Sequence, residues 1–258
     1  MASFVKFDSR PRLRRPVLIE GLPGIGGVGK LVADFLADEL GAERMARIYS
    51  EHLPPHLTVD DECKTSMACQ EIRYVERDDG DLVFLLGDYQ GSSLEGQFIL
   101  SETVFRMILE FDPSMVITLA GYGDGEECPS PRVLGAVSDT SMKPRLESCG
   151  VTFSPGEPEG GVVGAAAALV GLGEAYGVDS VCLMGETAGT SADPAAASRV
   201  AECVARMLGL EVDASKLLES EESDTVVKEQ EPDKGDLSYF GRGFLYHQHY
   251  ILNRYPTP

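Results

Sequence analysis

Near its start the chain reads Val17-Leu-Ile-Glu-Gly-Leu-Pro-Gly-Ile-Gly-Gly-Val-Gly-Lys30. The first four residues of this stretch form a short apolar run that predicts a buried strand. Residues 28–40 carry apolar side chains at helical spacing. The glycines in between allow a tight turn from strand to helix. The segment therefore predicts a strand–turn–helix unit near the start of the chain.

The same alternation continues along the sequence. Apolar runs predict strands at 45–49, 67–75, 81–86, 115–120, 133–137 and 180–184, and helical periodicity predicts helices at 98–111, 160–176 and 194–208. Asp193-Pro194 is a typical helix start, with an N-cap followed by proline at the first helical position. Strands interleaved with covering helices predict an α/β fold, a three-layer α/β/α sandwich around a mostly parallel mixed sheet.

Composition limits the classes of partner. The chain has 258 residues, 43% of them hydrophobic, and a net charge of −20. A strongly negative surface repels phosphate backbones and anionic lipids, so non-specific nucleic-acid or membrane binding is not expected. No apolar run approaches the roughly 20 residues needed to span a bilayer, and the first ten residues have no signal-peptide core. We expect a soluble, cytoplasmic protein.

The glycine turn fits two phosphate-binding patterns. Gly24, Gly26 and Gly29 have the spacing of a dinucleotide-binding fingerprint, and Gly24 to Lys30 resembles a P-loop. Leu31 occupies the position at which a P-loop has a hydroxyl side chain that binds magnesium. Gly27 adds a further glycine, and all four also suit a turn that packs closely on a sheet without any ligand. The residues leave a structural turn and an anion-binding loop as alternatives.

No catalytic or metal-binding set is evident. Lys30, Glu186 and Asp193 are the conceivable components of an ATP-dependent site, but they form no convincing set. His52 and His56 have helical metal-ligand spacing, and the two prolines between them forbid that helix. We expect no metal and no cofactor. The six cysteines include no CxxC pair and are expected to be free thiols.

The end of the chain differs in composition. Residues 211–236 hold ten acidic residues against three lysines, and aromatic residues follow. We predict one α/β domain over residues 1–215, an acidic linker over 216–236 and an aromatic tail over 237–258. Tail residues that follow a solvated linker are candidates for partner binding: Leu237, Tyr239, Phe240, Gly241, Phe244, Tyr246, Tyr250 and Tyr255.

Four ordered motifs give the chain a resemblance to a known family. They are Glu20-Gly-Leu-Pro-Gly-Ile-Gly-Gly-Val-Gly29, His52-Leu-Pro-Pro55, Ile117-Thr-Leu-Ala-Gly-Tyr-Gly123, and Leu183-Met-Gly-Glu-Thr-Ala-Gly189 followed by Asp193-Pro-Ala-Ala-Ala197. Together they resemble the proteasome assembly chaperone PAC2 family, whose archaeal members are often labelled ATP-grasp-like. The resemblance covers roughly residues 15–215.

The resemblance implies a fold similar to that of purine nucleoside phosphorylases and a homo-oligomer. It also implies binding to the α-subunit ring of the 20S proteasome without a catalytic step, in which case the glycine turn holds the fold. The alternative is a phosphate- or nucleotide-binding enzyme, a ligase or a phosphorylase-like transferase, that uses Gly24 to Lys30.

Ring binding in such proteins resembles insertion of a C-terminal tail with the pattern hydrophobic, aromatic, any residue. The end of this sequence departs from the pattern, because Thr257 occupies the penultimate position. Tyr239-Phe240-Gly241 would match it if the chain ended at Gly241. We therefore expect residues 237–255 to contact a partner either after trimming or through their aromatic side chains.

Overall fold

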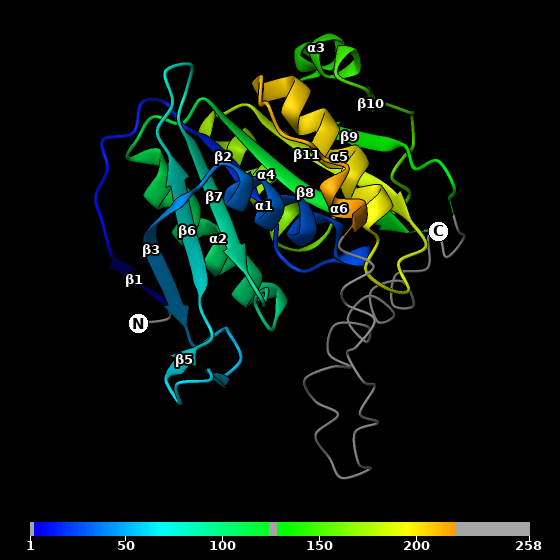
Figure 1. Ribbon diagram of the computed structural model, residues 1–258. Coiled ribbons are helices and arrows are strands. Elements are labelled where there is room, and N and C mark those ends of the chain that lie inside the picture. The colour runs from blue at the N-terminus through cyan, green and yellow to red at the C-terminus, as the bar shows by residue number, and fades with distance from the viewer. Residues whose placement is uncertain (1–2, 124–127, 220–258) are drawn as a thin grey trace. The chain divides into compact units, whose positions relative to one another are not determined.

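A nine-stranded mixed sheet organises the part of the chain that the computed structural model describes, residues 3–123 and 128–219 (Figure 1). The strand order is β1-β3-β6-β7-β2-β8-β11-β9-β10, and β4 and β5 pair separately. The strands are β1 (Ser3–Phe7), β2 (Val17–Glu20), β3 (Glu43–Ser50), β4 (Leu57–Val59), β5 (Thr65–Met67), β6 (Gln70–Val75), β7 (Leu82–Gly87), β8 (Met115–Gly123), β9 (Val133–Val137), β10 (Val151–Thr152) and β11 (Ser180–Thr187).

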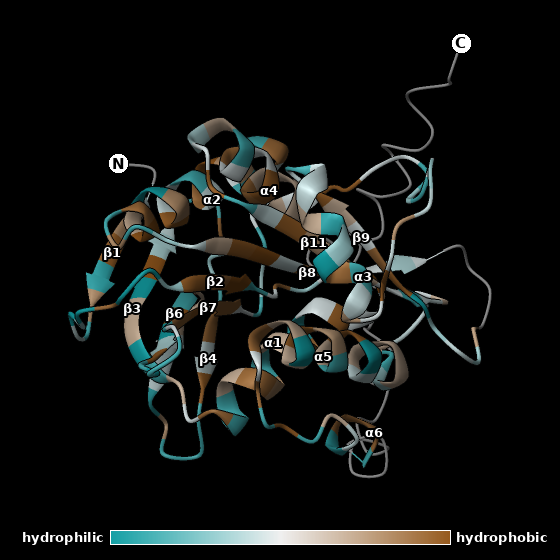
Figure 2. Cartoon of the chain, turned by 90° about the horizontal axis from the view of Figure 1, so that it is seen from above, coloured by the Kyte–Doolittle hydropathy of each residue, from teal (hydrophilic) through white to brown (hydrophobic). Residues whose placement is uncertain are grey.

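Helices cover both faces of the sheet. Figure 2 shows α2 and α4 on one side and α1 and α5 on the other. The helices are α1 (Val28–Glu39), α2 (Leu94–Leu109), α3 (Lys143–Ser148), α4 (Gly164–Tyr176), α5 (Pro194–Leu208) and α6 (Lys216–Glu219). The predicted strand over 17–20 and the helix over 194–208 have the predicted bounds, and the predicted α/β class is confirmed.

The alternation of side chains along β2 explains the two layers of core. Leu18 is buried with side chains of α2 and α4, whereas its neighbour Ile19 is buried with side chains of α1 and α5. Successive residues of a strand point to opposite faces, so a strand buried on both faces is apolar throughout. This is why the run at 17–19 is continuous rather than alternating.

The prediction of a mostly parallel sheet is wrong for the outer strands. The central strands β7, β2, β8 and β11 are parallel to their neighbours in that series, and β10 is parallel to β9. The other four pairings are antiparallel: β1 with β3, β3 with β6, β6 with β7, and β9 with β11. The β6–β7 hairpin explains part of the difference, because a short acidic turn connects two neighbouring strands and forces them antiparallel.

Helix α6 lies at the end of the described residues. It falls within the first residues of the predicted linker, and its Leu217 is buried in the α1–α5 core layer. The remainder of the linker and the whole aromatic tail, from 220 onward, lie outside the described residues. None of the helices in the described part of the chain is long and apolar enough to cross a membrane.

Candidate functional site

The glycine turn caps the carboxyl ends of the central parallel strands. It leaves β2 at Glu20, passes through a single 3₁₀ turn at Ile25–Gly27 and enters α1 at Val28. Gly26 and Gly27 have φ angles of 60° and 61°. This left-handed region is unfavourable for residues with a β-carbon, so glycine is required by the backbone conformation itself.

Three glycines let backbones approach each other directly. A β-carbon at Gly29 would lie 2.2 Å from the carbonyl oxygen of Leu119 in β8, and one at Gly121 would lie 2.2 Å from the carbonyl oxygen of Ile25. At Gly21 it would lie 2.2 Å from the carbonyl oxygen of Gly29 in α1. No side chain fits at these positions, which leaves the turn and the first helical residues packed on the sheet.

The loop after β11 holds the glycine turn from a second side. The backbone N–H of Asp193 donates to the carbonyl of Gly26 at 2.9 Å. The Asp193 carboxylate accepts from the N–H of Ala196 at 2.9 Å and caps α5, as the sequence predicts. A β-carbon at Gly26 would lie 2.7 Å from the hydroxyl of Thr187. Two of the sequence motifs therefore meet in space and interlock.

Lys30 is engaged in ion pairs with neighbouring carboxylates. Its ammonium lies 2.9 Å from Asp34, one turn along α1, and 2.9 Å from Asp88, just after β7. It also donates to the carbonyl of Gly87 at 3.4 Å. Burial alone would lower the pKa of Lys30, but the hydrogen bonds to the two carboxylates raise it above its ordinary value. The lysine is charged and is directed to the carboxyl end of β7.

Glu20 is a feature of this site that sequence analysis missed. Its side chain is buried, and its carboxyl accepts hydrogen bonds from the backbone N–H groups of Leu22, at 3.1 Å, and of Leu119. The second carboxyl oxygen has no partner within the described residues. Burial raises the pKa of Glu20 to about 8. The available signal was its position at the end of an otherwise apolar strand.

Gln90 was also missed and joins the turn to the opposite layer. Its amide nitrogen donates to the carbonyl of Pro23 at 2.6 Å, and its amide oxygen accepts from the N–H of Ala165 in α4 at 3.1 Å. One side chain thus ties the glycine turn to the first residues of α4. Its sequence context, a loop after β7, contains no motif that could have indicated this role.

The side chain of Glu186 contacts a different part of the protein from the side chain of Asp193. It forms an ion pair with the guanidinium of Arg132 and accepts from the backbone N–H of Arg132 at 2.9 Å. Arg132 also contacts Glu157 at 3.3 Å. The hydrogen bonds from Arg132 hold the pKa of Glu186 below its usual range. Of the three residues considered for an ATP-dependent site, only Asp193 contacts the turn's own backbone, and the two others are ion-paired elsewhere.

The remaining candidates fall into two groups. Within residues 3–123 and 128–219, no group of three or more histidine, cysteine or acidic side chains is arranged to hold a metal ion. His52 and His56 lie in the turn and loop that precede β4, and the six cysteines are free, three of them buried. The candidate tail residues, from Leu237 to Tyr255, lie outside the described residues.

The chain is an α/β protein whose nine-stranded mixed sheet has helices on both faces. An interlocked glycine turn covers the carboxyl ends of its central parallel strands. A model of the PAC2 family matches residues 18–231, and the chain therefore belongs to the PAC2 family. An uncharacterized protein of Methanocaldococcus jannaschii, MJ1210, is 33% identical over 205 residues, which are 80% of this chain and 78% of that protein.

Two solved structures from Pyrococcus furiosus are similar over most of their length. PbaB, described as an archaeal proteasome activator, has a TM-score of 0.79 at 34% identity, with 86% of this chain and 95% of PbaB covered. PbaA, described as an archaeal homologue of a proteasome-assembly chaperone, has a TM-score of 0.72 at 27% identity, with 85% of this chain and 92% of PbaA covered.

Proposed function

We propose that this protein is a non-enzymatic, cytoplasmic proteasome-binding protein or assembly chaperone that contacts the α-subunit ring of the 20S proteasome. The observation that carries the proposal is the similarity to PbaB, at 34% identity over 95% of that chain. The similarity to PbaA supports the same class of partner. A homo-oligomer and a likeness to the fold of purine nucleoside phosphorylases, as the family resemblance implies, belong to the same proposal.

The contacts of the glycine turn support a structural role for Gly24, Gly26, Gly27, Gly29 and Lys30. Gly29 is pressed against β8, Gly26 against Thr187, and Lys30 is paired with two carboxylates. A P-loop lysine must instead reach the phosphates of a nucleotide. Titration calorimetry with ATP, NAD and phosphate tests the alternative of a phosphate- or nucleotide-binding enzyme. Stoichiometric heat from any of the three would favour that alternative.

The aromatic tail is the proposed contact element. A tail on a solvated linker can reach a pocket on another protein and place hydrophobic and aromatic side chains in it. The free-energy cost of ordering such a tail is modest. The proposed residues are Leu237, Tyr239, Phe240, Gly241, Phe244, Tyr246, Tyr250 and Tyr255, tethered by an acidic linker.

Binding to cognate α rings tests this proposal. Three versions should be compared: the full chain, a chain ending at Asp236 and a chain ending at Gly241. All three retain every described residue. We expect the full chain to bind and the chain ending at Asp236 to lose binding, while the version ending at Gly241 shows whether Tyr239-Phe240-Gly241 is sufficient. Equal binding of all three rejects the role of the tail, and no binding of either the full chain or the chain ending at Gly241 rejects the function.

A further inference from the structure

Four fully buried side chains carry an oxygen atom that has no hydrogen-bond partner within the described residues. The atoms are Oε2 of Glu20, Oε1 of Gln70, Oγ of Ser101 and Oγ1 of Thr118, and none of these residues is more than 2% exposed. Buried polar groups in folded proteins nearly always have a partner, either another protein group or an ordered water molecule. Oxygens of this kind therefore indicate places where a polar ligand completes the interior.

All four belong to the core layer between the sheet and helices α2 and α4. Glu20, Gln70 and Thr118 each lie two residues along a strand from a side chain that is buried in this layer: Leu18, Ile72 and Val116. Side chains two residues apart on a strand point to the same face. Ser101 is a residue of α2, which covers that face. The unmet need for hydrogen bonds is thus concentrated on one face of the sheet.

Glu20 and Thr118 are neighbours in the centre of the sheet. They are directly paired across β2 and β8, and Thr118 is paired in turn with Cys182 of β11. Neighbouring strands lie ~4.8 Å apart, so the three side chains form a row across the central strands. Glu20 Oε2 and Thr118 Oγ1 are not hydrogen-bonded to each other, because both lack a partner. A small ligand with hydrogen-bonding capacity on two sides can bridge such a pair of oxygens.

The chemistry of the row selects a neutral ligand. Burial raises the pKa of Glu20 to about 8 and that of Cys182 to about 12, so both groups carry their protons at neutral pH. Glu20 Oε1 accepts from the N–H of Leu22, which leaves Oε2 to carry the proton. A row of neutral carboxyl, hydroxyl and thiol groups has no net charge to hold a metal ion or an anion. Water, which donates two hydrogen bonds and accepts two, matches these donors and acceptors.

The helix that covers this row contributes small side chains. Ala166, in the first turn of α4, is buried in one cluster with Cys182, and its neighbour Ala165 is buried in the α2–α4 layer. The Gln90 amide holds this end of α4 to the glycine turn, as described above. Small side chains on the covering helix suit a site for one water molecule, which needs only ~15 Å³ of space for its centre.

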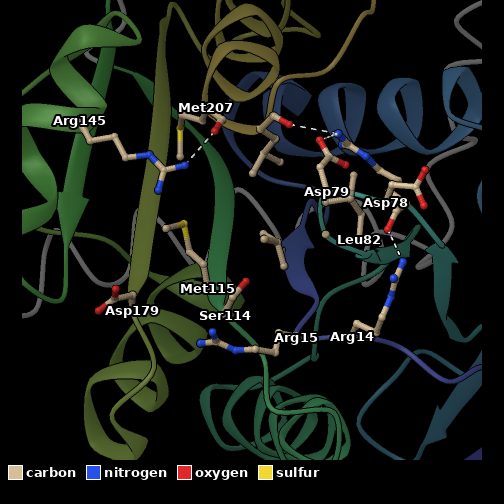
Figure 3. A pocket seen from close by; sticks show the side chains of 14 residues that line it. Arg14, Arg15, Asp78, Asp79, Leu82, Ser114, Met115, Arg145, Asp179 and Met207 are labelled. Atoms are coloured by element: carbon tan, nitrogen blue, oxygen red, sulfur yellow. Dashed lines mark hydrogen bonds and ion pairs between the residues drawn. The ribbon is translucent and has the colours of Figure 1, made fainter.

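The surface cleft at the other end of the strands has different properties. It has a volume of about 570 Å³ and is lined by the first residues of β2, β7 and β8 (Figure 3). Arg77 is paired there with Asp79, and Arg145 donates to the carbonyl of Met207 at 3.1 Å. Within the described part of the chain, no residue that lines the cleft has a buried side-chain polar atom without a partner. The partnerless oxygens therefore direct attention to the interior row and not to this cleft.

We propose that Glu20, Thr118 and Cys182 bind one buried water molecule that bridges the end of β2 to β8 and β11 beneath the glycine turn. The water supplies the missing partner of Glu20 Oε2 and of Thr118 Oγ1. It also accounts for two polar residues in strands that are otherwise apolar and buried. The site links the Glu20–Gly29 motif to the Ile117–Gly123 motif through the interior, and the inference is independent of the proposed binding to α rings.

Oxygen-17 magnetic relaxation dispersion of the full chain tests the proposal, because it counts water molecules that exchange slowly from the interior. Thr118→Val keeps the shape of the side chain and removes the hydroxyl, and it should show one long-lived water fewer than wild type. Thr118→Ser keeps the hydroxyl and should show the wild-type number. Thr103→Val is the matched control, since the Thr103 hydroxyl already donates to the carbonyl of Ile99 at 2.7 Å, and it should leave the number unchanged. Thermal unfolding checks that each variant is folded.

A crystal structure of wild type decides the question even if Thr118→Val fails to fold. One peak of electron density at hydrogen-bond distance, ~2.8 Å, from both Glu20 Oε2 and Thr118 Oγ1 would support the site. A direct hydrogen bond between the two oxygens, or no density between them, would overturn it. A peak at ~2.4 Å from several oxygens would identify a metal ion and overturn the proposed ligand.

The solution measurement can also overturn the inference. Equal numbers of long-lived waters in wild type and Thr118→Val would show that no water depends on this hydroxyl. Loss of a water in Thr118→Ser as well would assign the effect to packing and not to the hydroxyl. None of these results bears on binding to α rings, which is measured separately.

Discussion

Replacing the buried Glu20 by glutamine should remove a large pH dependence of stability. The Glu20 carboxyl lies beneath the glycine turn, where burial raises its pKa from the ordinary 4.5 to about 8. Glutamine keeps an oxygen that can accept from the N–H groups of Leu22 and Leu119, and it carries no proton to lose. The Glu20→Gln variant therefore keeps the shape of the site and removes its titration.

The sign follows from the difference between the folded and unfolded chains. Below pH 4.5 both are protonated at Glu20, and the group has no effect on the pH dependence. Between pH 4.5 and about 8 the unfolded chain releases the proton while the folded chain keeps it, so rising pH favours unfolding. At ~1.4 kcal/mol for each tenfold change in proton affinity, the loss approaches ~5 kcal/mol by pH 8.

Urea denaturation of wild type and variant at pH 5 to 9 measures this effect. The free energy of unfolding of Glu20→Gln should rise relative to wild type by several kcal/mol between pH 5 and 8, and the gap should then level off. Glu51→Gln, the same change at an exposed residue, serves as the control and should show no such trend. A gap that stays constant over this pH range would show that the pKa of Glu20 is not raised in the folded protein.

Further predictions concern the glycine turn. Gly29→Ala should lower the free energy of unfolding by more than ~3 kcal/mol, because its β-carbon would lie 2.2 Å from a carbonyl oxygen. Gly24→Ala, whose β-carbon would lie 3.9 Å from the nearest atom, should lower it by less than ~1 kcal/mol. Thermal or urea unfolding measures both. Equal effects would contradict the proposed close packing. Asp193→Ala should cost about 1 kcal/mol by loss of the α5 cap, and Asp193→Asn should retain most of it. Lys30→Met should lower the free energy of unfolding by no more than ~1 kcal/mol, since the ion pairs of Lys30 are partly exposed. It should also leave α-ring binding unchanged in a pull-down. Loss of ring binding would assign the lysine a role that we do not propose.

Local sequence was sufficient for the centre of the fold. The strand over 17–20 and the helix over 194–208 are determined by contiguous apolar runs, helical periodicity and a capping residue, all of which act over a few positions. Helix α2 begins four residues before the predicted start, at Leu94, because the N-cap Ser93 lies ahead of the apolar face. The amphipathic pattern thus predicted the middle of this helix but not the residue at which it begins.

The edges of the sheet required tertiary information. Strand β1 is only partly buried, and its order depends on pairing with β3, more than 35 residues along the chain. Strands β4 and β5 have three residues each and no buried side chain, so they give no burial pattern that sequence analysis could detect. The β6–β7 hairpin follows from its short acidic turn, which ends in glycine, but the other antiparallel pairings were missed, since strand direction is a property of the assembled sheet.

The candidate site was located by its glycines, but its chemistry was not determined by them. The P-loop pattern depends on where Lys30 points, and its partner Asp88 is 58 positions away in sequence. The contact of Gly29 with Leu119 is equally remote. A glycine pattern that serves close packing and one that serves phosphate binding are therefore indistinguishable locally, because both require the same absence of a side chain.

Native mass spectrometry of the full chain mixed with cognate proteasome α rings tests the proposal that this chain binds the ring. We expect a species whose mass equals that of a ring plus bound copies of this chain, and we expect added ATP to leave that mass unchanged. Rings and chain that remain separate at every ratio, under conditions where each is folded, would contradict the proposal.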